Sequence, residues 1–101
     1  MKRRLDLSLL ALDDLRDARD WYDAQQPGIG SEFIRSVDAA LACIYRTPHV
    51  FPMVYENVRR CLTRRFPYGI FFVEQPDTLL IVAIYHTHRN PRDWQARNVK
   101  R

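Results

Sequence analysis

The 101-residue sequence has no long hydrophobic run and only two cysteines. No segment approaches the roughly 18 consecutive apolar residues that a membrane-spanning helix needs, so we expect no membrane association. The basic start, residues 1–4, is followed by an acidic residue instead of a long apolar segment, which argues against a signal peptide and favours a cytoplasmic protein. We predict that Cys43 and Cys61 are buried, free thiols; a disulfide or a metal site is the alternative.

Lysine is also scarce, because fourteen of the sixteen basic residues are arginine. Arginine presents a planar fork of donors that suits carboxylates and phosphates. The charges are unevenly distributed: residues 13–38 carry seven acidic and three basic side chains, whereas residues 59–101 carry nine basic and three acidic ones. An acidic front half and a basic back half would offer charged partners two places to bind, and a solvated basic face is the alternative.

Apolar residues are plentiful, at 47% of the chain with 12% aromatic, which is enough for a packed core. The length suits one domain over residues 1–101. Residues 2–7 predict a short strand. A helix is predicted from an N-cap at Ser8 to Gln26, where Pro27-Gly28 ends it. A second amphipathic helix between Gly30 and Pro48 would complete an antiparallel helical hairpin.

The second half of the chain predicts strands. Residues 49–57 contain a proline and little periodicity, so a loop is expected there. Strands are predicted at residues 58–65, 68–74 and 78–86. The last of these is apolar throughout residues 79–85, which indicates a central strand covered on both faces.

The order of strand, helix, helix and three strands predicts an α+β fold (β-α-α-β-β-β) in which the helical hairpin packs on one face of an antiparallel sheet. The expected core consists of Tyr22, Phe33, Val37, Leu41, Ile44, Ile70, Phe72, Val82 and Ile84. The arginine-rich residues 90–101 are expected to be irregular, with a short turn near Trp94.

Three groups of residues, in order along the chain, carry a resemblance to a known family. They are Trp21-Tyr22 followed by Gln26-Pro27-Gly28-Ile29-Gly30; Arg59-Arg60 followed by Arg65-Phe66-Pro67-Tyr68; and His86, Arg89, Pro91 and Trp94. Together they resemble the RelE/ParE superfamily, the toxins of bacterial type II toxin–antitoxin pairs, and most closely its ParE-like branch. The resemblance implies a growth-inhibiting toxin of the kind that stabilises plasmids, held with a cognate protein antitoxin in a hetero-oligomer.

The resemblance also implies two alternative targets. RelE-like members cut messenger RNA on the ribosome, which needs a base, an acid and cations for the phosphate. Gly69 stands where those nucleases commonly carry an arginine, and the position of a late tyrosine falls near Trp94 or Gln95. Neither departure suits a nuclease. We therefore favour the ParE-like function, in which the toxin binds and poisons DNA gyrase without catalysis, and an endoribonuclease acting on the ribosome and mRNA is the alternative.

The candidate site residues follow from these motifs. A target-binding surface is predicted at Arg64, Arg65, His86, Arg89, Arg92 and Trp94, and an antitoxin-binding surface at Trp21, Tyr22 and Arg60. If the chain is a nuclease, His86, His88 and Arg89 are the expected catalytic residues, with both histidines on one strand face. Trp21 and Trp94 also fit simple packing roles. No cofactor and no metal site is expected, because the two histidines lack an obvious third ligand.

Overall fold

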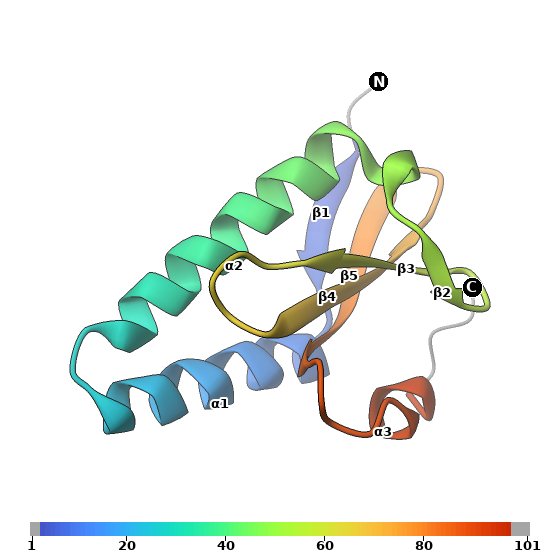
Figure 1. Ribbon diagram of the computed structural model, residues 1–101. Helices are drawn as coiled ribbons and strands as arrows, with labels where there is room; N and C mark the ends of the chain where they lie inside the picture. The colour runs from blue at the N-terminus through green and yellow to red at the C-terminus, as the bar shows by residue number, and fades with distance from the viewer. Residues whose placement is uncertain (1–2, 98–101) are drawn as a thin grey trace.

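The computed structural model describes residues 3–97 as a helical hairpin covering one face of a five-stranded sheet (Figure 1). Along the chain, the elements are β1 (Arg4–Leu7), α1 (Leu9–Gln25), α2 (Ile29–Arg46), the 3-10 turn η1 (Pro48–Val50), β2 (Met53–Tyr55), β3 (Val58–Leu62), β4 (Tyr68–Glu74), β5 (Thr78–His86) and α3 (Arg92–Gln95). The predicted α+β class and the hairpin are confirmed. No helix among the described residues is both long enough and apolar enough to cross a membrane.

The sheet is mixed, whereas a purely antiparallel sheet was expected. Its strand order is β1-β5-β4-β3-β2, and β1 runs parallel to β5 while the other neighbours are antiparallel. Local sequence patterns identify strands but not which distant strand becomes a neighbour, and β1 pairs with residues more than seventy positions later. The sequence also failed to predict β2, because this three-residue edge strand is largely exposed and follows a proline.

The helical hairpin forms at the residues where it was predicted from the sequence. The Ser8 hydroxyl accepts a hydrogen bond from the Ala11 N–H and so caps α1. Between the helices, Gly28 adopts a φ of +96°, a conformation that side chains disfavour. A Cβ at Gly30 would lie 2.6 Å from the carbonyl oxygen of Arg19, so only glycine lets the helices approach this closely. The Asp23 carboxylate accepts hydrogen bonds from both glycine amides and fixes the turn.

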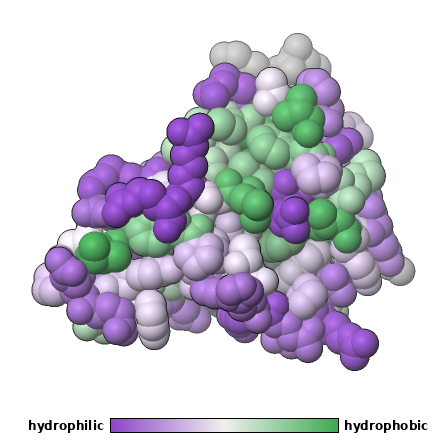
Figure 2. Space-filling view, in the orientation of Figure 1, coloured by the Kyte–Doolittle hydropathy of each residue, from purple (hydrophilic) through white to green (hydrophobic). Residues whose placement is uncertain are grey.

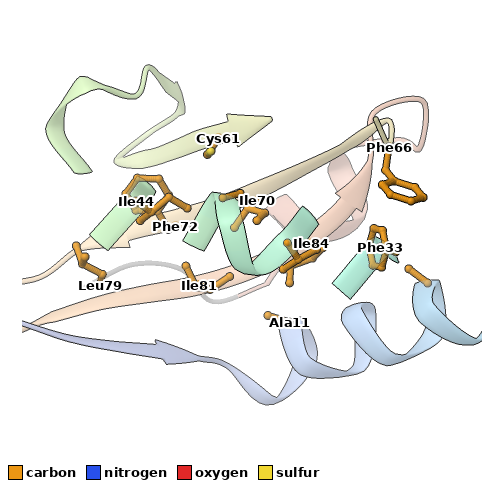
Figure 3. Close-up of a cluster of buried hydrophobic side chains, with 13 residues drawn as sticks. Ala11, Phe33, Ile44, Cys61, Phe66, Ile70, Phe72, Leu79, Ile81 and Ile84 are labelled. Atoms are coloured by element: carbon orange, nitrogen blue, oxygen red, sulfur yellow. The ribbon is translucent and has the colours of Figure 1, made fainter. Parts of the chain in front are cut away.

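The main core lies between the hairpin and the sheet (Figure 3). Of the nine predicted core residues, six are buried there: Phe33, Val37, Ile44, Ile70, Phe72 and Ile84. Tyr22 and Leu41 are only half-buried at its border, because they sit at the rim of the hairpin. Val82 is buried on the opposite face of the sheet.

That opposite face, which we call the outer face, has a smaller core of its own. It comprises Val58, Phe71, Val73, Val82, Ala83, Tyr85 and Trp94. Trp94 comes from α3, so the C-terminal segment covers this face where no large helix does (Figure 1). The prediction that β5 is a central strand covered on both faces is therefore confirmed.

A buried ion pair covers the edge of β5 beyond the point where β1 ends. Arg97 contacts both carboxylate oxygens of Asp14, at 2.8 and 3.0 Å. Asp14 also accepts a hydrogen bond from the Ile84 N–H, and Arg97 donates to the carbonyl of Val82. The hydrogen bond to Asp14 raises the pKa of Arg97. The pair thus satisfies backbone groups that β1 leaves unpaired, which protects the sheet edge.

Candidate binding site at the end of β5

A hollow of about 240 Å³ opens on the outer face at the end of β5. We call it the strand-end pocket, and the residues that give it its chemistry are Arg60, Phe71, Tyr85, His86, Arg89 and Trp94. They come from β3, β4, β5, the segment after β5 and α3. The pocket therefore combines an aromatic floor with cationic side chains.

The floor is built by Trp94 and its stacking partners. The indole stacks on Phe71 with ring centroids 4.4 Å apart, and Tyr55 meets it edge-on at 5.7 Å. Trp94 is only 2% exposed, so most of its surface is used for packing. This arrangement anchors α3 on the sheet and gives the pocket a rigid wall. A contribution of Trp94 to target binding stays a prediction.

Arg89 stands over the aromatic ring of Tyr85. Its guanidinium carbon lies 4.0 Å from the ring centroid, and one guanidinium nitrogen donates to the Tyr85 hydroxyl at 2.9 Å. Asp93 approaches the same group at 3.9 Å, while more than half of the Arg89 side chain remains exposed. Cation–π stacking and the hydroxyl hold the guanidinium in place and leave further donors for a partner.

Arg60, which lines the same pocket, has an unsatisfied hydrogen-bond donor. Its Nε is buried and has no hydrogen-bond partner among the described residues. Burying an unpaired donor costs about 1–3 kcal/mol, and such groups are uncommon in native proteins. The sequence motif had assigned Arg60 to antitoxin binding, but the structure places it beside His86 and Arg89. Arg60 therefore lines the pocket at a cost to stability, because its Nε is buried without a partner among the described residues.

The two histidines lie side by side, although not on one strand face as expected. β5 ends at His86, and His88 belongs to the turn that follows. The backbone N–H of His88 donates to His86 Nδ1 at 3.0 Å, and the two rings are 5.4 Å apart. Neutral His86 therefore carries its proton on Nε2, which makes that atom a donor. Serving as a base would first require His86 to lose its contact with His88.

Gly69 lies on β4 under the ring of Phe71. A Cβ added there would sit 3.0 Å from Cζ of Phe71 and 3.4 Å from Cγ of Arg60. The first contact is tighter than side chains normally allow. A side chain at this position would therefore require the Phe71 ring to shift by a few tenths of an ångström.

The other predicted target-binding residues do not join the strand-end pocket. Arg64 and Arg65 lie in the β3–β4 turn and border a separate groove along α2. Arg65 forms a 2.7 Å ion pair with Glu32, and the Arg64 carbonyl accepts a hydrogen bond from Ser36. Arg92 is exposed at the start of α3. The residues of the predicted target-binding surface are therefore divided between the strand-end pocket and the groove along α2.

The predicted antitoxin-binding aromatics lie near the tip of the hairpin. Trp21 is 58% exposed and meets Tyr22 edge-on at 5.1 Å. Tyr22 itself packs against Phe33 and Phe66, and burial raises its pKa. Packing explains Tyr22, whereas the exposed indole of Trp21 is available to a partner.

Both cysteines are free, and they differ in burial. Cys61 is buried as predicted, whereas Cys43 is only half-buried because it faces the groove along α2. Burial, with a smaller effect of Cys43, raises the pKa of Cys61 to about 11. The thiol of Cys61 consequently stays protonated at neutral pH and is not an activated nucleophile.

The most informative groups that sequence reasoning missed are Phe71, Tyr85, Asp14 and Arg97. Phe71 and Tyr85 lie in the core of the outer face, and nothing in the sequence indicated that the C-terminal segment would return to cover that face. The same return brings Arg97 to Asp14, eighty-three residues earlier in the chain. Only the folded arrangement of the tail reveals these contacts.

The α+β fold, with a helical hairpin on one face of the sheet, agrees with the fold class that the resemblance implied. A family model described as "ParE toxin of type II toxin-antitoxin system, parDE" matches residues 5–91. The match covers well over half of the chain, so the chain belongs to the ParE toxin family and is a toxin of a type II toxin–antitoxin system.

A solved structure described as "Chromosomal ParDE TA system from P. aeruginosa" shares the fold, with a TM-score of 0.78. It is 16% identical in sequence, and the match covers 86% of this chain and 98% of that one. No curated protein matches the sequence.

Proposed function

We propose that this ParE-type toxin stops bacterial growth by binding and poisoning DNA gyrase, and that the strand-end pocket makes the decisive contact. The observation that carries the proposal is that Arg60, His86 and Arg89 line one hollow with an aromatic floor. Arg89 is held in place by Tyr85 and keeps more than half of its side chain exposed. A carboxylate on the target would accept charge-assisted hydrogen bonds from the guanidinium groups.

Two observations support binding over catalysis. His86 Nδ1 is engaged by His88, so no free imidazole base faces the pocket. At Gly69, where related nucleases carry an arginine, this chain has no side chain to bind a phosphate, and an added Cβ would press against the Phe71 ring. The alternative, a RelE-like ribosome-dependent endoribonuclease, draws on the fact that Arg60, His86 and Arg89 would also suit a phosphate.

The proposal includes neutralisation by a cognate protein antitoxin in the cytoplasm, within a toxin–antitoxin hetero-oligomer. Membership of the ParE family supports an antitoxin partner. The exposed Trp21, at the tip of an acidic hairpin, and the arginine-lined groove along α2 provide two surfaces of opposite charge for it.

Expression of the toxin without its antitoxin tests the target. Because the proposal involves binding to gyrase, we expect filamentation and induction of the DNA-damage response while transcripts stay intact. The measurements are microscopy, a damage-responsive reporter and mapping of transcript 5′ ends. Rapid codon-phased transcript cleavage would instead establish the nuclease, and unimpaired growth would rule out both activities under those conditions.

A further inference from the structure

Two guanidinium groups contact the ring of Tyr85, a buried tyrosine that lines the strand-end pocket. The guanidinium carbon of Arg89 lies 4.0 Å from the ring centroid, and that of Arg97 lies 5.2 Å from it. The Tyr85 side chain is only 4% exposed, so these contacts and the surrounding outer-face core set its orientation. Arg89 lines the pocket, whereas Arg97 lies outside it. Tyr85 therefore connects a pocket residue with a residue beyond the pocket.

Arg97 is itself fixed by Asp14 of α1. The guanidinium contacts both carboxylate oxygens of Asp14, at 2.8 and 3.0 Å, and donates to the Val82 carbonyl at 2.9 Å. Asp14 is held in turn, because it accepts a hydrogen bond from the Ile84 N–H at 3.0 Å. Charge-assisted hydrogen bonds of this kind leave an arginine little freedom to move. Through Arg97, the ring of Tyr85 is thus tied to the first helix.

Arg89 has a competing partner in Asp93, which lies four residues further along the chain. One Arg89 nitrogen, Nη2, lies 2.9 Å from the Tyr85 hydroxyl and 3.9 Å from the Asp93 carboxylate. Both charged side chains are more than half exposed, and Figure 2 shows hydrophilic surface in the region of α3, where they lie. If the Tyr85 ring moved, the guanidinium would be free to close on Asp93. The carboxylate would then occupy donors that a target needs.

We propose that Asp14 and Arg97 are positioning residues for Arg89. By holding the ring and the hydroxyl of Tyr85 in place, they keep the Arg89 guanidinium at the strand-end pocket and away from Asp93. A guanidinium that is ordered before binding loses less conformational freedom when the target arrives, so the complex is tighter. This inference rests on the proposed function, in which Arg89 contacts gyrase.

Removing the ion pair as a unit tests the inference. Asp14→Asn combined with Arg97→Met leaves no unpaired buried charge, and the new amide oxygen can still accept from the Ile84 N–H. Because Arg89 would lose its pre-ordering, half-maximal inhibition of gyrase supercoiling should require about three- to tenfold more of this double variant than of wild type. Adding Asp93→Asn removes the competing carboxylate and should restore part of the inhibition.

The matched control removes another partly buried ion pair, at the far end of β4. Glu74 ends that strand, whereas Tyr68, at its other end, pairs with His86 of the pocket. Arg3→Met combined with Glu74→Gln breaks a 2.8 Å contact there. Inhibition by this control variant should stay within about twofold of wild type.

Mobility of the Arg89 side chain separates positioning from a general loss of structure. NMR relaxation of the Arg89 Nε in the free toxin should show a lower order parameter in the double variant, while the backbone amides of β5 and α3 keep theirs. Arg97→Lys keeps a cation for Asp14 but lacks the planar guanidinium that contacts Tyr85. This variant should also loosen Arg89, and it decides the question if the double variant does not fold.

Several results would overturn the inference. They are wild-type inhibition by the folded double variant, an Arg89 side chain as ordered as in wild type, no recovery with Asp93→Asn, or equal loosening of the backbone. Failure of the wild-type toxin to inhibit gyrase would instead overturn the proposed function. The relaxation measurement would then still show whether Asp14 and Arg97 order Arg89.

Discussion

Replacing Asp14 with alanine is expected to lower the free energy of unfolding by about 3 kcal/mol, which is a large fraction of the stability of a domain this size. The carboxylate has only 10% of its side-chain surface exposed, and Arg97 has 15%. Truncation would leave the guanidinium without its counter-charge and the Ile84 N–H without an acceptor. Both the unpaired guanidinium and the unpaired N–H would then lie at the edge of β5 that β1 does not cover.

Thermal and urea unfolding measure this effect directly. For a chain of about 100 residues, a loss of 3 kcal/mol lowers Tm by about 12–24 °C. The matched control is Asp17→Ala, which removes an exposed aspartate from the same helix and should cost less than about 0.5 kcal/mol. If the two variants unfolded at the same temperature, the Asp14–Arg97 pair would not secure the edge of β5.

Replacing Arg60 with methionine should greatly reduce toxicity without reducing stability. Methionine retains the aliphatic packing but removes the buried Nε that has no partner, so unfolding should be unchanged or slightly harder. If a carboxylate of the target binds the Arg60 guanidinium at the pocket, losing the contact should weaken target binding by about thirtyfold or more. The measurements are the plating efficiency of induced cells and Tm of the purified protein. A substitution that lowers toxicity without lowering stability is typical of a functional residue that is retained at a cost to stability.

The partners of Arg60 in the pocket should behave in the same way. Arg89→Ala combined with His86→Ala should abolish toxicity while Tm and antitoxin binding change little, because both side chains are largely outside the core. Arg16→Met, which replaces an exposed arginine of α1, is the control and should stay toxic. If these variants misfolded, the role of the pocket residues would be structural. Full toxicity in folded variants would move the active surface elsewhere, first of all to the hairpin tip at Trp21.

Features encoded by neighbouring residues could be predicted from the sequence. The cap at Ser8, the break at Pro27-Gly28 and the bounds of β4 and β5 depend on local backbone chemistry and side-chain periodicity, and the structure agrees with each of them. β3 is shorter than expected, because the chain leaves the sheet after Leu62 to form the turn at Arg65, whose φ is +71°.

Features that depend on distant contacts could not be predicted. The parallel pairing of β1 with β5 and the contact of Arg97 with Asp14 join opposite ends of the chain. The same limitation affected the candidate site. Arg64 and Arg65 were predicted to lie with His86 and Arg89, but the β3–β4 turn places both arginines at the groove along α2. Arg60, which was assigned to antitoxin binding, lines the strand-end pocket with His86 and Arg89 instead. The residue types therefore predicted the chemistry of the site, but they did not predict which residues would lie together.

A supercoiling assay with purified gyrase and purified toxin tests directly whether the strand-end pocket binds gyrase. Wild-type toxin should inhibit supercoiling and increase the amount of cleaved DNA held in gyrase complexes. Arg60→Met should require about thirtyfold more protein for the same effect, whereas Arg16→Met should match wild type. Undisturbed supercoiling at saturating wild-type toxin, or equal inhibition by Arg60→Met and wild type, would contradict the account.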